Sequence, residues 1–308
     1  MYLCYDRLKL YIFEIKMPKL IFNKIYVIQS LDKNEEQTGK LIYDEVIKVR
    51  TKYSDKCDAE FILVNNRHDL ENSLIKINED CLNGVKPIIH LEIHGNENGD
   101  GLTLENNEYI GYSELCNSLT KININSGNNL FLTLAVCHGA WIMQNIKLDK
   151  PAPFVGVIGS FEKIGNIDLY IRYSEFYSEF LINFDFDKSF DILQKVNKKI
   201  PNTYRVLDSV ELFKNVYKNY LQENTSEEGI KKRLSQIYYE KEHFEKIKLL
   251  INSKLKKFFF EIAFKIYIQR TRQEYFRKHS EIFFMIDKYP NNRERFEVPY
   301  TYKELFKI

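Results

Sequence analysis

The chain of 308 residues is 44% hydrophobic and 29% charged, the composition of a globular protein with one large domain or one domain and an extension. The formal net charge is only +2, but residues 1–200 carry 23 basic and 28 acidic side chains, whereas residues 201–308 carry 22 basic and 15 acidic ones. A basic C-terminal third can bind an acidic partner or a membrane surface, although a Lys-rich, solvated helical face is the simpler interpretation. Nucleic-acid binding is not expected.

The cysteine content argues against a disulfide-stabilised protein and against a Cys-rich zinc site. The five cysteines are an odd number, and none lies in a CxxC pair, so neither framework is expected. Free thiols fit a cytoplasmic location. Charged side chains interrupt residues 1–19, so we expect an N-terminal arm there and no signal peptide.

No membrane-spanning segment is expected either. The most apolar stretch after the N-terminal arm covers residues 258–268, where Glu261 and Lys265 interrupt it. It is also too short to cross a bilayer. The simpler interpretation is that this run belongs to the core of a helix rather than to a lipid-binding surface.

Strand and helix patterns alternate along the first two thirds of the chain. In chain order, the sequence predicts a strand at residues 24–30, a helix at 39–53, a strand at 60–64, a helix at 69–82, a strand at 87–93, a short hairpin at 102–104 and 109–110, a helix at 112–120, strands at 129–136 and 154–159, helices at 167–182 and 187–198, and a strand at 203–207 followed by a helix. This alternation indicates a mostly parallel sheet with helices on both faces.

The last third has a different pattern. Residues 226–287 are rich in Lys, Glu and Phe and nearly free of Gly and Pro, so they are predicted to form long helices. Phe259, Ile262 and Ile266 recur at helical spacing, and such a helix must pack on the protein core or on a partner. We therefore divide the chain into the N-terminal arm, an α/β domain at residues 20–222 and a basic helical extension at residues 223–308.

Two candidate catalytic residues follow predicted central strands. His94-Gly95 comes at the end of strand 87–93, and Cys137-His138-Gly139 comes at the end of strand 129–136. Functional groups gather at the carboxyl ends of parallel strands. If the two strands are neighbours, the imidazole of His94 and the thiol of Cys137 face each other, which suits a Cys nucleophile with a His acid/base. The amides of Gly95 and Cys137 are the candidate donors to an oxyanion.

The two blocks IIHLEIHGNENGDGLTL and LFLTLAVCHGA resemble the His and Cys blocks of the caspase-like superfamily, which includes caspases, metacaspases, gingipains, separases and bacterial CHAT-domain proteases. In caspases the His lies about 50 residues before the Cys, and here the separation is 43 residues. The resemblance covers roughly residues 20–222. It implies a caspase-like sandwich, with a mostly parallel central sheet between helices, and a cysteine endopeptidase that uses a His-Cys dyad without cofactor or metal.

The resemblance also implies a substrate pocket near Cys137, for which we consider Ala135, Ser160 and Glu162. Metacaspases carry an acidic residue two positions before the Cys, where this chain has Ala135. Cleavage after Arg or Lys would therefore require Glu162 or Asp168 to supply the charge. The expected target is a protein. The bacterial relatives imply antiphage defence and a gasdermin-like pore former as substrate, and the C-terminal helices are candidates for docking a regulatory protein.

Alternative interpretations remain open from the sequence. His90 shares strand parity with His94 and is interpreted as a core histidine, and a zinc site built from His90, His94, Cys137 and His138 is disfavoured because these residues lie on a strand. An α/β-hydrolase with Cys137 on its nucleophile elbow would take its base from His243 or His279. A caspase-like scaffold without catalysis is the non-enzymatic alternative.

Overall fold

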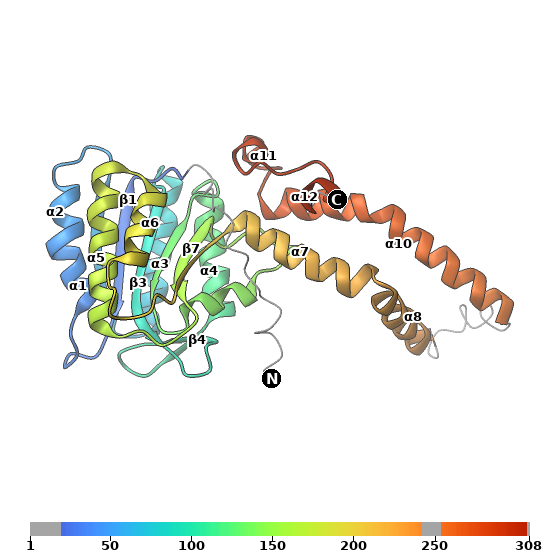
Figure 1. Cartoon of the computed structure of the whole chain (residues 1–308), viewed down its shortest axis with the longest axis horizontal. Coiled ribbons are helices and arrows are strands. Elements are labelled where there is room, and N and C mark those ends of the chain that lie inside the picture. Colours follow the sequence, from blue (N-terminus) through green and yellow to red (C-terminus); the bar gives the residue numbers. More distant parts are fainter. Residues whose placement is uncertain (1–19, 242–253, 307–308) are drawn as a thin grey trace. The chain divides into compact units, whose positions relative to one another are not determined.

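The computed structural model describes residues 20–241 and 254–306 of the chain (Figure 1). The described residues form two compact units. The first unit consists of the described residues up to Asn145 together with Pro153–Asp208, and the second of Ile146–Ala152 and the described residues from Ser209 onward.

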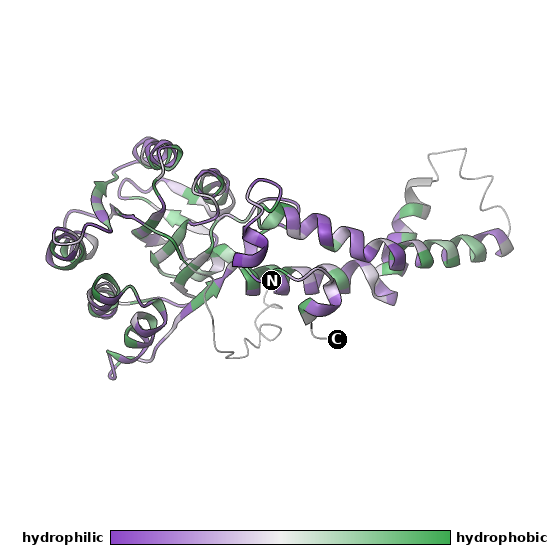
Figure 2. Ribbon diagram, turned by 90° about the horizontal axis from the view of Figure 1, so that it is seen from above, coloured by the Kyte–Doolittle hydropathy of each residue, from purple (hydrophilic) through white to green (hydrophobic). Residues whose placement is uncertain are grey.

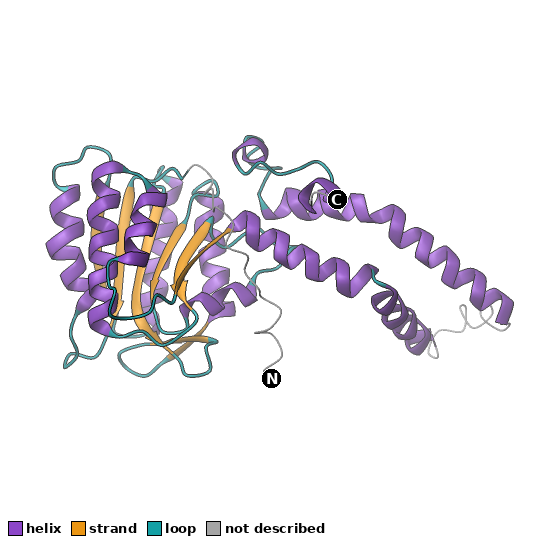
Figure 3. Cartoon of the chain, in the orientation of Figure 1, coloured by secondary structure: helices purple, strands orange, loops and turns teal. Residues whose placement is uncertain are grey.

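The centre of the first unit is a mostly parallel sheet (Figure 3). Its strands are β1 (Lys24–Ser30), β2 (Asp58–Leu63), β3 (Pro87–Gly95), β6 (Phe131–Ala135), β7 (Gly156–Ser160) and β8 (Tyr204–Asp208), in the spatial order β2-β1-β3-β6-β7-β8. Only β8 in this series runs antiparallel to its neighbour. A small antiparallel hairpin, β4 (Gly101–Thr103) and β5 (Tyr109–Gly111), extends from the end of β3. Because β3 and β6 are central neighbours, their carboxyl ends meet at one edge of the sheet.

Helices cover both faces of this sheet (Figure 1). One face carries α1 (Thr38–Ile42), the π-helical turn η2 (Tyr43–Ile47), α2 (Lys48–Thr51), α5 (Asn166–Asn183) and α6 (Phe186–Lys195), and the other carries α3 (Arg67–Leu82) and α4 (Tyr112–Asn125). Strands β3, β6 and β7 are almost entirely buried, as expected for parallel strands with helices on either side. The predicted α/β class is confirmed and is consistent with a caspase-like sandwich that carries C-terminal helices.

Local sequence explains how the main covering helices form. Asn66 caps α3, since its side chain accepts a hydrogen bond from the amide of Asp69, which satisfies one of the free donors at a helix start. In α5, a stripe of aromatic residues at helical spacing is completely buried. Its members are Tyr173, Phe176, Tyr177 and Phe180. The ring of Tyr173 meets the imidazole of His90 on β3 edge to face, with centroids 4.9 Å apart.

The second unit is helical. It contains α7 (Ser209–Thr225), α8 (Glu227–Lys241), α10 (Lys254–Phe283), α11 (Asn292–Arg295) and α12 (Tyr302–Phe306). Phe213 of α7 packs against Phe276 and Phe283 of α10, with ring centroids 6.1 and 5.2 Å apart. This aromatic packing assigns α7 to the helical unit, so the unit begins at Ser209 rather than at residue 223.

The structure differs from the predicted elements at several places. Strand β3 continues through His94 and Gly95 because both residues pair with β4. The antiparallel direction of β8, the 3-10 helix η3 (Gly139–Asn145) and the short helices α11 and α12 were not predicted. Among the described residues, no helix is long and apolar enough to cross a membrane. The predicted N-terminal arm lies outside the described residues.

Candidate active site

The register between β3 and β6 brings the two candidate catalytic residues to the same edge of the sheet. Glu92 lies opposite Ala135, and this is the last pair of the ladder. His94 is two residues beyond Glu92, and Cys137 is two residues beyond Ala135. The two residues therefore lie at matching positions just past the last pair of the ladder. The 43-residue separation in the sequence equals the register offset of the two strands. The expected neighbourhood of the two strands is therefore present.

The backbone contact at Gly95 is the closest link between the two blocks. A Cβ atom added at Gly95 would lie 1.7 Å from the carbonyl oxygen of Cys137 and 3.2 Å from Cγ1 of Val136. No side chain fits in that space, so only glycine allows the residue after His94 to pack directly on the backbone of Cys137. The amides of Gly95 and Cys137 thus belong to adjoining backbone segments.

Cys137 is partly exposed, unlike the other described cysteines. Its sulfur lies 3.4 Å from the amide nitrogen of Ile164 and 3.7 Å from the carbonyl oxygen of the same residue. Ile164 belongs to the loop after β7. A thiol can donate to this carbonyl, and a thiolate can accept from this amide, so Ile164 contacts the sulfur in either protonation state.

His138 holds the same loop against the strand end. Its backbone lies in the left-handed region with φ of 60°, which is uncommon for a residue other than glycine. Its amide donates to the carbonyl of Glu162 at 3.1 Å, and its Nδ1 lies 2.9 Å from the carbonyl of Phe161. His138 is therefore a local hydrogen-bonding residue, as interpreted from the sequence. The strained backbone at this position turns the chain sharply after Cys137.

His94 has a carboxylate partner that the sequence did not reveal. Its Nε2 lies 2.7 Å from Oε2 of Glu35, in the segment between β1 and α1. Both side chains are close to half exposed, at 47% and 40%. When Nε2 carries the proton and donates it to Glu35, Nδ1 is the basic nitrogen of the neutral ring. No hydrogen bond occupies Nδ1 within the described part of the chain, so this nitrogen can accept a proton from a thiol or a water.

A buried polar network lies next to His94, on the same face of β3. His90 is completely buried, with Nδ1 2.8 Å from the hydroxyl of Thr133 and Nε2 3.3 Å from Glu92. Thr38, at the start of α1, donates its hydroxyl to Glu92. The sequence interpretation of His90 as a satisfied core histidine agrees with these contacts. The network attaches the start of α1, and with it the segment that carries Glu35, to the strand that carries His94.

The candidate pocket residues lie in different environments. Ala135 and Ser160 are buried, and the Ser160 hydroxyl bonds Thr203 and accepts from the amide of Glu162. Ser160 therefore shapes the loop rather than facing a substrate. Asp168 is also buried, in an ion pair with Arg172, and is unavailable to a substrate cation. Of the acidic and pocket candidates, Glu162 alone is exposed.

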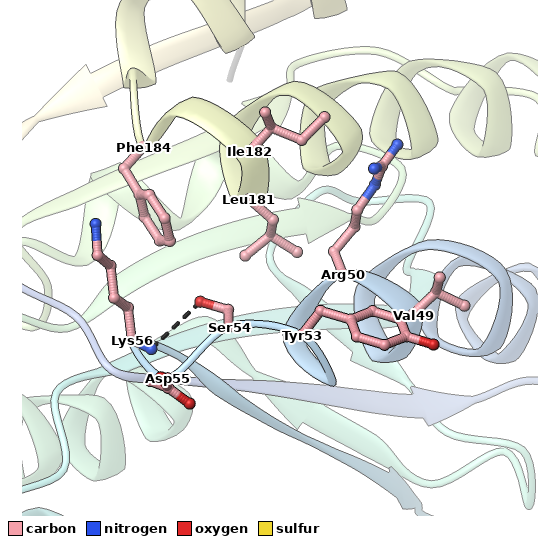
Figure 4. A pocket seen from close by; sticks show the side chains of 9 residues that line it. All are labelled: Val49, Arg50, Tyr53, Ser54, Asp55, Lys56, Leu181, Ile182 and Phe184. Atoms are coloured by element: carbon pink, nitrogen blue, oxygen red, sulfur yellow. Dashed lines mark hydrogen bonds between the residues drawn. The ribbon is translucent and has the colours of Figure 1, made fainter.

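A groove of about 550 Å³ lies away from these residues (Figure 4). It is formed by the end of α2, the loop before β2 and the end of α5, and is lined by Val49, Arg50, Tyr53, Ser54, Asp55, Lys56, Leu181, Ile182 and Phe184. This loop precedes β2, so the groove is at the amino ends of the parallel strands, opposite His94 and Cys137.

The geometry supports neither the zinc site nor the α/β-hydrolase that the sequence left open as alternatives. In the described residues, no group of three or more His, Cys, Asp or Glu side chains is arranged to hold a metal ion. His279 lies on α10 in the helical unit, where its ring contacts Tyr217, Tyr220 and Tyr275. Burial lowers its pKa below the usual value. His243, the other candidate base of an α/β-hydrolase, lies outside the described residues.

Comparisons with known proteins add no assignment. No model of a known protein family matches the chain, and the curated proteins contain no match to it.

Cys137 is expected to be the most reactive described thiol. Burial raises the pKa of the Cys57, Cys81 and Cys116 thiols to about 12, so at pH 8 these three remain protonated and inaccessible. Treatment of the native Cys4→Ser protein with iodoacetamide at pH 8 should modify Cys137 first, as measured by peptide mass spectrometry. In guanidinium chloride all four thiols should react alike. Equal labelling of all four in the native protein would contradict this assignment.

Proposed function

We propose that the chain is a cysteine endopeptidase in which Cys137 is the nucleophile and His94 the general acid and base. The observation that carries the proposal is the meeting of the His and Cys blocks at the carboxyl ends of β3 and β6, in backbone contact through Gly95. Peptidases and esterases both use such a pair. We favour a polypeptide substrate because His94 is exposed and Cys137 is partly exposed at the carboxyl ends of their strands, and because the sequence blocks resemble those of caspase-like proteases.

The proposed reaction has two stages. In the first, His94 accepts the thiol proton, the Cys137 thiolate attacks the peptide carbonyl, and His94 returns the proton to the departing amine, which leaves a thioester on Cys137. In the second, His94 removes a proton from water, the hydroxide attacks the thioester, and the Cys137 thiol leaves with the proton from His94. The amides of Gly95 and Cys137 are the proposed donors to the oxyanion in both stages.

Glu35 is proposed as a positioning residue. Its contact with Nε2 favours the tautomer in which Nδ1 of His94 is free to take a proton. Because both side chains are partly exposed, we expect Glu35→Ala to lower kcat by about 10- to 100-fold, below the loss for a buried triad carboxylate. Glu35→Gln keeps an oxygen acceptor and should retain more activity than Glu35→Ala.

The kinetics of these variants distinguish positioning from substrate binding. A positioning role predicts that kcat falls while KM stays near the wild-type value. As a matched control, Glu36→Ala changes the neighbouring exposed carboxylate, which has no contact with His94 in the described residues, and should leave kcat unchanged. An equal effect of Glu35→Ala and Glu36→Ala, or an effect on KM alone, would remove Glu35 from the mechanism.

Cleavage can be tested without knowing the substrate. The full chain is incubated with a complex mixture of peptides, and new amino termini are identified by mass spectrometry. We expect new termini with the wild type and with His279→Ala, but none with His94→Ala or Cys137→Ala. Loss of cleavage with His279→Ala, and not with His94→Ala, would favour the α/β-hydrolase. No new termini with any protein would favour a scaffold.

The resemblance adds narrower proposals about the biological setting. We propose that the protein works in the cytoplasm, consistent with free thiols at all four described cysteines, and that its substrate is a protein such as a gasdermin-like pore former in antiphage defence. We also propose that the second unit docks a regulatory partner. The exposed carboxylate of Glu162, in the loop that contacts Cys137, supports a basic residue before the cleaved bond.

A further inference from the structure

Helix α10 has two halves with different environments. From the middle of the helix to its C-terminal end, Ile268, Phe276 and Phe283 are at most 3% exposed, and the two phenylalanines pack on α7. The N-terminal half, which begins at Lys254, leaves large apolar side chains in solvent; Figure 2 shows hydrophobic residues along it. Phe258, Phe259, Ile262 and Ile266 are 56%, 59%, 39% and 45% exposed. We call these four residues the α10 stripe.

The α10 stripe occupies one face of the helix. Phe258, Ile262 and Ile266 are four residues apart, and residues at this spacing share a face of an α-helix. The inward side is different, since Phe260 and Phe264 stack on each other with centroids 6.3 Å apart, and the Arg233 guanidinium of α8 lies 5.5 Å from the Phe264 ring. The Phe264 side of the helix therefore contacts α8, and the α10 stripe lies on the opposite side.

Cationic side chains surround the α10 stripe. Residues 254–270 contain five lysines and arginines and a single carboxylate, that of Glu261. At 100° per residue, Lys265 and Arg270 fall on opposite flanks of the stripe, and neither has an ion-pair partner among the described residues. A contiguous exposed apolar patch marks an interaction site. Apolar residues flanked by cations that can extend toward lipid headgroups are typical of helices that lie in a membrane interface.

We propose that the α10 stripe binds the surface of a bilayer that contains anionic lipids, with α10 lying in the interface rather than crossing it. The positive charge around the stripe favours an anionic bilayer as the binding partner. A second copy of α10 would bring two cationic sets together, whereas anionic headgroups complement them. Nucleic acid is disfavoured because the centre of the face is apolar. This inference differs from the sequence interpretation of residues 258–268 as helix core, and it does not depend on the proposed peptidase activity.

Vesicle sedimentation of the full chain tests the proposal. We expect binding to phosphatidylcholine vesicles that contain phosphatidylserine, and at least tenfold weaker binding to pure phosphatidylcholine, since each cation near an anionic surface contributes about fivefold. The double variant Phe259→Glu/Ile266→Glu should weaken binding by about a hundredfold, because it removes the burial of two large apolar side chains. Lys265→Glu/Arg270→Glu should weaken it by about 25-fold or more.

The matched control is Ile167→Glu, which places the same charge at an isolated apolar residue of α5 that is 69% exposed, and which should bind vesicles like the wild type. Circular dichroism checks that every variant is folded. Folded wild type that ignores the anionic vesicles, or binding that Phe259→Glu/Ile266→Glu leaves unchanged, would overturn the proposal. The proposal would also fail if light scattering showed that the wild type forms a concentration-dependent dimer, if this variant were monomeric, and if neither protein bound vesicles.

Discussion

Cys137→Ala is expected to lower kcat by on the order of 10⁴-fold or more while the protein stays folded, because no other group in the proposed mechanism can form the thioester. His94→Ala should lower kcat by about 10²- to 10⁴-fold, the range for loss of a general acid/base. Cys137 is only partly buried, so its removal should change the free energy of unfolding by less than about 1 kcal/mol. Turnover of a peptide identified from the cleavage mixture provides the measurement.

Cys116→Ala is the control for this change. It removes the same thiol group at a buried position of α4 in the same unit, and it should leave kcat within about twofold of the wild type, because Cys116 has no proposed role in the reaction. If Cys137→Ala turned over the peptide as fast as Cys116→Ala, the nucleophile would lie elsewhere.

Asp168→Ala is expected to have the largest effect on stability. Asp168 and Arg172, one turn apart on α5, are 4% and 0% exposed, and Nε of Arg172 lies 2.8 Å from the carboxylate. Removing one partner of a buried ion pair leaves the other charge uncompensated, which costs about 3–5 kcal/mol of unfolding free energy. Urea denaturation at neutral pH, followed by circular dichroism, measures this loss.

The same guanidinium also supports the segment that leads into β8. Arg172 donates to the carbonyl groups of Leu193, Gln194, Asn197 and Ile200. The matched control is Asp191→Ala, which breaks an exposed ion pair with Lys195 at the same four-residue spacing and should cost less than about 1 kcal/mol. If Asp168→Ala cost no more than Asp191→Ala, the buried pair would not be the anchor that its contacts indicate.

The positions of His94 and Cys137 at strand ends could be predicted from the sequence, because each of their blocks ends an apolar strand. Strand β1 was predicted with its observed bounds, and the His94 and Cys137 blocks both follow β-branched or leucine-rich runs. The sequence could not show that β3 and β6 are neighbours, since pairing depends on contacts between distant segments. The equality of the sequence separation and the register offset becomes visible only once the sheet order is known.

Glu35 could not be predicted, for a different reason. The segment DKNEEQ offers three carboxylates, and the local turn decides which of them reaches His94. The amide of Glu35 donates to the carbonyl of Asp32, and the amide of Thr38 donates to the carbonyl of Glu36. These contacts set the direction of the Glu35 side chain.

Neither the burial of the candidate pocket residues nor the end of the first unit could be predicted from the sequence. Ser160 and Asp168 have the polarity expected of pocket residues, but each is buried and hydrogen-bonded. Polarity alone does not distinguish a buried, paired group from an exposed one. The unit ends at Asp208 because the aromatic residues of α7 pack on α10, and the helical pattern of α7 does not indicate which unit it joins.

Covalent labelling by peptidyl acyloxymethyl ketones, which alkylate a cysteine only after the peptide binds near it, tests the central claim most directly. The full chain in the Cys4→Ser form is incubated with probes that differ in the residue before the electrophile, and the adduct is located by mass spectrometry. We predict a single adduct on Cys137, formed much more slowly in His94→Ala. An adduct on Cys57, Cys81 or Cys116 with Cys137 unmodified, or labelling of Cys137 at the same rate in His94→Ala, would contradict a His94–Cys137 dyad.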